Sequence, residues 1–352
     1  MTLCLFNRRT WIASIPALLA TSTLLSRAVV AETPLAAARV VSLTPLEPDQ
    51  PIPVVTALAV DPAGNFLAVA GDDKAIRIVR ASDFVEIAVL KGHRDLIRTV
   101  DFRGDSKILV SGGNDGSLIL WNLAQGYREA GRVDDLPAIC SAKFSPSGKQ
   151  IAVVGFSADL MIFGGDAKPL RLRCDCNDLR SCVYDRLGKQ LAVVGRSGHV
   201  HLFDAQSGEF LNDFDLHAGR IRNCDFTRDG EHLVTVGEDG AAILFNLKKA
   251  EVVRRIDLLP CKLFALSRIT ETQMAVAGSD NRIRVVDFES GLVVTHLDGH
   301  RGSISTLVYA NGSLFSGGFD TTLRRWPIAG DAGERLAEKD SPELPPKVTS
   351  SR

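Results

Sequence analysis

Short apolar segments that end in glycine recur along this chain at a nearly constant interval. After each glycine come a few polar residues and then another apolar segment. The interval is always 40 to 42 residues, and the glycines are Gly71, Gly113, Gly155, Gly195, Gly237, Gly278 and Gly318. A repeat of this length fits a four-stranded β-propeller blade better than a helical hairpin or a leucine-rich turn. The spacing therefore predicts an all-β chain in which one unit recurs seven times.

The segments before these glycines predict strands that are buried on both faces. They are nearly continuous apolar runs at residues 66–70, 108–111, 151–154, 191–194, 233–236, 274–277 and 314–316. A free antiparallel sheet with one wet face would alternate apolar and polar positions instead. Turns rich in Gly, Asp, Asn and Ser come before most of these runs, as at residues 61–64, and they predict antiparallel hairpins. We therefore expect each blade to lie between two others in a ring.

The two ends of the repeating region predict how the ring closes. The seventh unit ends at Ile328 after three strands, and an unassigned apolar strand occupies residues 37–46. Pairing these two would remove exposed strand edges, which invite aggregation. We predict a single seven-bladed propeller of four-stranded antiparallel blades over residues 32–329, closed by pairing of the N-terminal strand with the last blade. The polar, proline-bearing residues 330–352 are expected to form a disordered tail.

Two units resemble the WD-repeat (WD40) family, and the weaker resemblance of the others extends it over residues 37–328. The matching residues are Gly92, His93, Ser111, Asp115 and Trp121 in the second unit and Gly299, His300, Ser316, Asp320 and Trp326 in the seventh. The resemblance implies a hydrogen-bond chain in which tryptophan donates to serine, serine to histidine, and histidine to the buried turn aspartate. A fully satisfied buried network of this kind makes a blade rigid.

The other units depart from this signature. The fifth keeps His217, Thr235 and Asp239 but has Phe245 in the position of the tryptophan. The first and sixth units keep only the aspartate of the set. These departures weaken the assignment of individual repeats, although the count of seven stands on the spacing.

The first 31 residues lie outside the repeat and predict an export signal. Arg8 and Arg9 precede an apolar stretch at residues 11–25, and small residues then favour cleavage after Ala31. The stretch is short and polar for a membrane span, which needs about 20 apolar residues. We expect a periplasmic or extracellular protein without a membrane span in the mature chain. The run at residues 7–12 resembles a twin-arginine signal, and the general secretory route stays open as the alternative.

The net charge limits the classes of partner that we expect, and the number of cysteines indicates whether disulfides can form. Removing residues 1–31 takes away three arginines and no acidic residue, so the net charge moves from −1 to −4. This near-balance does not favour a nucleic-acid partner or a membrane surface. Six cysteines would remain, an even number that permits disulfides in an exported protein. They are Cys140, Cys174, Cys176, Cys182, Cys224 and Cys261.

The positions of these cysteines say more about packing than about pairing. Cys182 and Cys224 occupy equivalent apolar positions in successive units, which favours buried thiols there. Cys174 and Cys176 lie in a predicted loop, and the disulfide connectivity stays open.

No catalytic constellation stands out in the sequence. It contains no nucleophile elbow, no phosphate loop and no His-Glu-x-x-His helix, so we expect neither a catalytic site nor a cofactor. His199 and His201 project from the same face of one strand, a spacing that would suit a metal if a third ligand converged. However, His201 aligns with Arg77, Arg284 and Arg324, which we interpret as solvated positions. We therefore expect no metal site.

One position of the repeat is unusually basic. The residues that follow the first apolar residue of each inner strand are Thr56, Arg98, Cys140, Arg180, Arg222, Lys262 and Ser305. Four of them, Arg98, Arg180, Arg222 and Lys262, are basic. The resemblance to WD-repeat proteins implies that this position faces the mouth of a central channel, where peptides and other ligands bind. Like charges gathered there repel one another unless acids such as Asp178 and Glu238, or a bound anion, offset them.

Our leading hypothesis is an exported, non-enzymatic WD-repeat scaffold that docks protein or peptide partners, acidic ones if the basic mouth takes part. It would act as a monomer or as a subunit of an envelope complex. The alternative is a propeller enzyme that uses the central channel, such as a lactonase-like hydrolase or a sugar-phosphate binding protein.

Overall fold

The computed structural model describes residues 39–164, 168–174 and 177–328. The expected signal at residues 1–31, the expected tail at residues 330–352 and Cys176 lie outside these ranges. Every regular element within them is a β-strand. The described residues include no helix that is long and apolar enough to cross a membrane.

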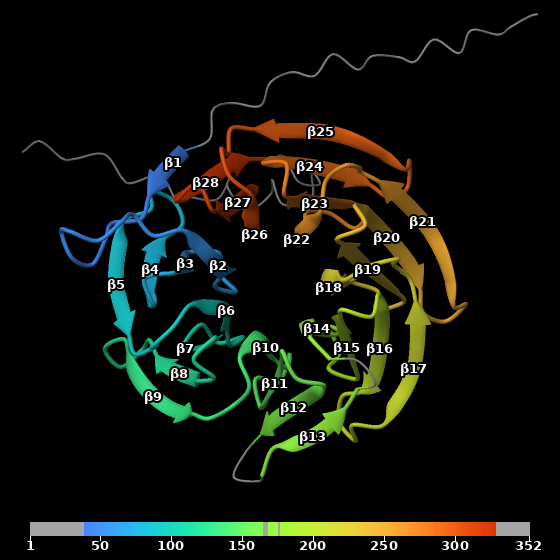
Figure 1. Cartoon of the computed structure of the whole chain (residues 1–352), viewed down its shortest axis with the longest axis horizontal. Coiled ribbons are helices and arrows are strands. Elements are labelled where there is room, and N and C mark those ends of the chain that lie inside the picture. The colour runs from blue at the N-terminus through green and yellow to red at the C-terminus, as the bar shows by residue number, and fades with distance from the viewer. Residues whose placement is uncertain (1–38, 165–167, 175–176, 329–352) are drawn as a thin grey trace, which may run out of the picture. The chain divides into compact units, whose positions relative to one another are not determined.

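Seven four-stranded antiparallel sheets are arranged radially, which confirms the predicted fold (Figure 1). In blades 1 to 6, the strands follow one another in chain order from the centre of the ring outwards. Blade 1 contains β2 (Val55–Val60), β3 (Phe66–Gly71), β4 (Ala75–Arg80) and β5 (Glu86–Lys91). Blade 2 contains β6 (Ile97–Phe102), β7 (Ile108–Gly113), β8 (Leu118–Asn122) and β9 (Arg128–Val133). Blade 3 contains β10 (Ile139–Phe144), β11 (Gln150–Gly155), β12 (Asp159–Gly164) and β13 (Leu170–Arg173).

The remaining blades complete the ring. Blade 4 contains β14 (Leu179–Tyr184), β15 (Gln190–Gly195), β16 (His199–Asp204) and β17 (Phe210–Asp215). Blade 5 contains β18 (Ile221–Phe226), β19 (His232–Gly237), β20 (Ala241–Asn246) and β21 (Glu251–Asp257). Blade 6 contains β22 (Leu263–Arg268), β23 (Gln273–Gly278), β24 (Arg282–Asp287) and β25 (Leu292–Asp298). Blade 7 contains β26 (Ile304–Ala310), β27 (Ser313–Gly318), β28 (Thr322–Pro327) and, from the other end of the chain, β1 (Arg39–Ser42).

The predicted closure of the ring is confirmed. β1 pairs antiparallel with β28, and Val41 lies opposite Leu323. Leu43, just beyond β1, packs in one apolar cluster with Phe315 of blade 7 and Leu67 of blade 1. The N-terminal strand therefore supplies the missing outer edge of blade 7, and the residue behind it helps to bury the seam between the last blade and the first.

The recurring glycine has a steric cause. A Cβ atom at Gly113 would lie 2.4 Å from the carbonyl oxygen of Leu96, and one at Gly155 would lie 2.0 Å from that of Ala138. In both cases, the carbonyl belongs to the residue just before the inner strand of the same blade. Because no side chain fits against this backbone, glycine marks the end of the second strand. This close approach explains why the period is visible in the sequence.

Buried hydrogen-bond networks fix three blades. In blade 2, the Trp121 indole donates to Ser111 Oγ over 2.8 Å, and Ser111 Oγ lies 2.7 Å from His93 Nε2. His93 Nδ1 lies 2.9 Å from Asp115 Oδ2. Blade 7 has the same arrangement with His300, Ser316, Asp320 and Trp326, and blade 5 has a shorter one with His217, Thr235 and Asp239. Burial lowers the pKa of His93, His217 and His300, which favours the neutral ring at pH 7. In each ring Nδ1 faces a carboxylate oxygen, so the neutral ring donates from Nδ1.

The interpretation of Arg77, Arg284 and Arg324 as solvated positions is wrong. Their side chains are only 2%, 12% and 12% exposed. Each forms an ion pair with the turn aspartate four residues earlier, as in the 2.6 Å contact between Arg77 Nη2 and Asp73 Oδ2. Blades 1 and 6 lack the histidine that elsewhere donates to this aspartate, so the arginine supplies the buried donor.

Candidate functional site: the mouth of the central channel

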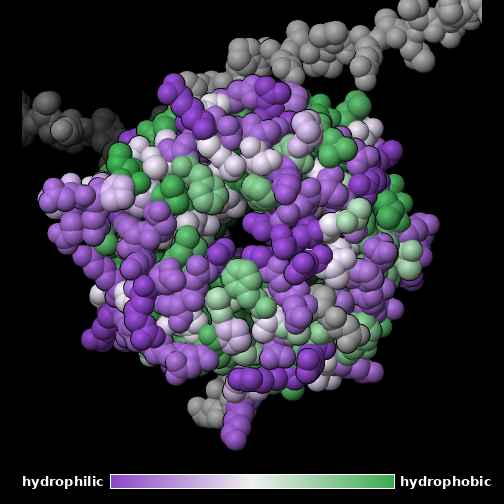
Figure 2. All heavy atoms as spheres, viewed as in Figure 1, coloured by the Kyte–Doolittle hydropathy of each residue, from purple (hydrophilic) through white to green (hydrophobic). Residues whose placement is uncertain are grey.

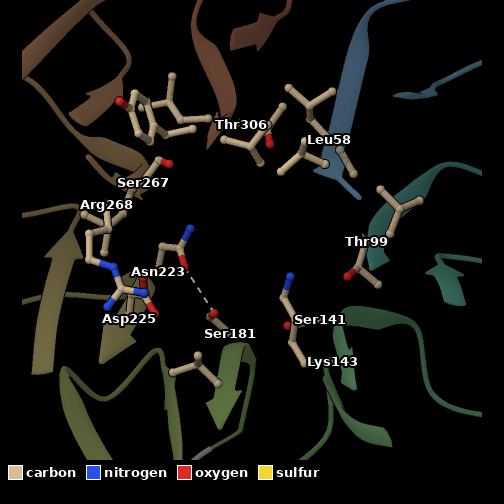
Figure 3. A pocket seen from close by; sticks show the side chains of 18 of the residues that line it. Leu58, Thr99, Ser141, Lys143, Ser181, Asn223, Asp225, Ser267, Arg268 and Thr306 are labelled. Atoms are coloured by element: carbon tan, nitrogen blue, oxygen red, sulfur yellow. Dashed lines mark hydrogen bonds between the residues drawn. The ribbon is translucent and has the colours of Figure 1, made fainter. Parts of the chain in front are cut away.

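A channel with a volume of about 1230 Å³ opens at the centre of the ring and is lined by the inner strands of all seven blades. The space-filling view shows the hollow, with hydrophilic residues along much of its border on that face (Figure 2). The wall is polar over blades 2 to 5, where the side chains of Thr99, Ser141, Ser181 and Asn223 point towards the opening (Figure 3). Asn223 Oδ1 accepts a hydrogen bond from the Ser181 hydroxyl over 3.3 Å.

Two carboxylates lie further along the same inner strands. Lys143 Nζ forms a 3.0 Å ion pair with Asp101 Oδ1. Asp225 lies near Arg268 in the close-up view, and burial raises the pKa of its carboxyl group (Figure 3). The channel therefore carries charges of both signs below its mouth.

The structure brings Arg98, Arg180 and Arg222 together, because all three line this channel. Each is the second residue of an inner strand, where a register shift interrupts the ladder with the next strand. The prediction that Lys262 is the second residue of its inner strand is wrong by one residue. Strand β22 begins at Leu263, which lies opposite Gly278, so Phe264 occupies the equivalent of Arg222.

The predicted position of Lys262 is wrong because it requires Cys261 to be the first residue of the inner strand. This apolar-type residue looks like the start of a strand, but its thiol donates to Asp280 Oδ1 over 3.2 Å from the preceding loop. Lys262 nevertheless reaches the same charge network, because its Nζ lies 3.4 Å from Glu238 Oε2. It is 58% exposed and lies outside the channel lining.

Five basic and two acidic side chains form what we call the mouth cluster. Its members are Arg98, Arg180, Arg220, Arg222, Lys262, Asp178 and Glu238. Asp178 contacts Arg180 at 2.5 Å and Arg220 at 2.8 Å. Glu238 contacts Arg220 at 2.8 Å and Arg222 at 3.4 Å. Both rim acids that were expected to neutralise the mouth therefore do bind its cations, but they are outnumbered.

Burial and the neighbouring charges together shift the pKa values of Glu238 and Arg222. Burial alone would raise the pKa of Glu238, but the hydrogen bond from Arg220 and the charges of Arg220, Arg222 and Lys262 hold it below its usual range. Burial lowers the pKa of Arg222, and the charges of Arg180 and Arg220 add to this effect. The cationic form of Arg222 is thus held at an electrostatic cost that a nearby anion would reduce.

Aromatic rings support the arginines. The guanidinium carbons of Arg98 and Arg180 lie 5.2 Å and 4.5 Å from the centre of the Phe156 ring, and that of Arg222 lies 5.0 Å from the Phe264 ring. These contacts are in the range of cation–π attraction. Arg98 also donates from Nε to Asn114 Oδ1 over 2.5 Å. It has a neutral partner, so its charge is not offset there.

Sequence reasoning missed four contributors to the mouth: Arg220, Phe156, Phe264 and Phe319. A signal was present for Phe156 and Phe319, since each directly follows one of the recurring glycines. Arg220 stands one residue before its inner strand, in the same place as Asp178 and Lys262. Comparing this neighbouring position across the units would have found it.

The remaining candidate residues have structural explanations. His199 Nδ1 and His201 Nδ1 lie 2.7 Å and 3.0 Å from the two carboxylate oxygens of Asp213. No group of three potential ligands for a metal occurs among the described residues. Cys182 and Cys224 are buried free thiols, as expected from their apolar positions, and Cys140 and Cys261 are free as well.

Seven radial four-stranded blades, with His-Ser-Trp hydrogen-bond networks in blades 2 and 7, define a β-propeller of the WD type. The family model "WD domain, G-beta repeat" matches residues 49–79, 84–122, 208–246 and 291–327. The chain is thus a seven-bladed β-propeller that contains WD repeats, as its sequence resemblance implied.

Curated relatives match only part of the chain. Eukaryotic translation initiation factor 3 subunit I of Aspergillus terreus is 26% identical over 170 residues, which cover 44% of this chain and 50% of that protein. Cilia- and flagella-associated protein 57 of Mus musculus is 36% identical over 92 residues, which cover 26% of this chain and 7% of that protein. The chain thus spans about half the length of the first relative.

A solved structure shows the same fold. It is the crystal structure of the Cps50 (Swd1) β-propeller domain of Myceliophteria thermophila, with a TM-score of 0.70 and 18% sequence identity. The match covers 78% of this chain and 97% of that domain.

Proposed function

We propose that this chain is an exported, non-enzymatic scaffold whose channel mouth binds an acidic peptide segment of a partner protein. The observation that carries the proposal is the mouth cluster, in which five cations face only two carboxylates. A local surplus of positive charge in a concave, partly desolvated site attracts anions even when the whole protein is close to neutral. The protein as a whole has a net charge of −1.

The comparisons support a scaffold role at a coarser level. WD-repeat propellers form a family of interaction scaffolds. One matched relative is named as a subunit of a translation initiation factor, and another is named as a THO complex subunit 6 homolog. On this basis, we propose that the present chain also works inside an assembly, and the export proposed below would place that assembly in the envelope.

Export is proposed from the residues at the start of the chain. Arg8 and Arg9 followed by the apolar stretch at residues 11–25 support a cleaved signal. Intact mass measurement of the protein recovered from its native compartment tests this. We expect a chain beginning at Glu32 outside the cytoplasm, and an uncleaved chain in the cytoplasm would contradict export.

Charge reversal at the mouth tests the docking proposal. The variant Arg180→Glu/Arg222→Glu is expected to lose at least about tenfold in capture by an immobilised glutamate-rich peptide at low salt, because two attractive charges become repulsive. The matched control is Arg128→Glu/Arg171→Glu, which makes the same change in net charge at exposed positions of the outer strands β9 and β13. Equal capture by the two double variants would refute a binding role for the mouth.

A further inference from the structure

The mouth of the channel is chemically uneven around the ring. The mouth cluster lies on the inner strands of blades 2, 4 and 5 and in the turns and lead-in segments of blades 4, 5 and 6. Blade 7 lines the same opening with Ser303, Ser305 and Phe319, none of which carries a charge. A ligand that crosses this opening therefore meets a basic side and a neutral side.

Phe319 is the exposed aromatic group of the neutral side. It follows Gly318 as Phe156 follows Gly155, and the two glycines hold the same position of their blades. Two guanidinium groups lie over the Phe156 ring, which is 40% exposed. Among the described residues, no aromatic ring or guanidinium stacks on Phe319, which is 55% exposed.

The backbone around Phe319 is held firmly. Its own N–H donates to the carbonyl oxygen of Ser303 over 2.9 Å. The Ser305 hydroxyl lies 2.6 Å from the carbonyl oxygen of Val55 and 3.1 Å from that of Gly317, which ties blade 7 to blade 1. The ring is therefore presented from a fixed turn, so that binding does not have to order a loop.

We propose that the mouth recognises a peptide in which an acidic side chain lies a few residues from an aromatic or large aliphatic one. The carboxylate would lie against Arg180 and Arg222, where Asp178 and Glu238, both shared with Arg220, offset only part of the charge. The apolar side chain would cover Phe319 and remove both groups from water. This inference rests on the proposed function, which requires only the acidic part of the ligand.

A double-mutant cycle between protein and peptide tests the pairing. The probes are three short, acetylated and amidated peptides: one with two glutamates and a phenylalanine, one with that phenylalanine changed to alanine, and one with both glutamates changed to glutamine. Titration calorimetry gives the Kd of each for the wild type and for Phe319→Ala. We expect loss of the peptide phenylalanine to weaken binding about tenfold on the wild type but less than about twofold on Phe319→Ala.

The control and the outcomes separate this inference from the proposed function. Leu292→Ala removes a similarly exposed apolar side chain (63% exposed) from the outer strand β25, and it should keep the full tenfold effect. If the phenylalanine and alanine peptides bind the wild type equally, the bipartite ligand is refuted while acidic docking stands. If no glutamate peptide binds at all, both proposals fail.

Discussion

At the scale of single residues, the structure shows that each turn aspartate needs a buried donor, which different blades supply in different ways. Histidine serves in blades 2, 5 and 7, and arginine serves in blade 1. In blade 6, Asp280 is held by the Cys261 thiol and by Arg284. The histidine donors could be predicted from the sequence, because the same residue types recur at the same positions of blades 2 and 7. The sequence conceals the arginine donors, because a charged residue such as Arg77 is expected to be exposed, although all but the last residue of β4 are buried.

The neutral histidines predict a specific dependence of stability on pH. Burial lowers the folded-state pKa of His93, His217 and His300 below the ordinary value of about 6.5, so the unfolded chain binds their protons more tightly. Stability is then complete above about pH 6.5 and falls as the pH drops below it, by at most about 1.4 kcal/mol per pH unit for each histidine.

Urea unfolding at several pH values between about 7.5 and 5 measures this slope. The variants His93→Gln and His217→Gln should be less stable at pH 7.5 but lose less of their remaining stability on acidification than the wild type. An equal loss in all three proteins would show that these histidines do not carry the effect.

At the scale of elements, the second strands were predictable from their apolar runs, and five of the seven glycines that end them have a close backbone contact as their cause. A Cβ atom is excluded where the second strand meets the residue before the inner strand, so the same residue type recurs. The closing strand was also predictable, since an unpaired apolar strand was left at each end of the repeat. The start of β22 was not, because Cys261 serves as a loop donor although its apolar character resembles a strand start.

Because the ring closes at blade 7, we predict that a substitution just beyond β1 lowers the stability of the protein strongly. Leu43 is 5% exposed within the cluster that joins blades 7 and 1, so Leu43→Ala should lower the free energy of unfolding by about 2 to 4 kcal/mol through lost burial and a residual cavity. Val40→Ala is the matched control, because Val40 is 45% exposed on β1 itself. Urea unfolding that gives the same small loss for both would mean that the seam contributes little to stability.

At the scale of the whole molecule, the proposed binding rests on the distribution of charge and not on its sum. The chain has 41 basic and 42 acidic residues, yet the mouth cluster has an excess of cations. The three arginines at the second position of inner strands were predictable from the repeat, because the period superimposes them. Their partners were not, since Phe156, Arg220 and Glu238 come from neighbouring turns and blades whose approach depends on the closed ring.

The salt dependence of peptide binding tests the central claim, that the mouth attracts anions although the protein as a whole is slightly acidic. The measurement is the Kd of a glutamate-rich peptide between about 0.03 and 0.3 M salt, for the wild type and for Arg180→Gln/Arg222→Gln, since screening acts over about 10 Å at 0.1 M. We predict that added salt weakens binding to the wild type and that the double variant binds more weakly with a flatter salt dependence. Binding that is insensitive to salt, or the same in both proteins, would contradict the account.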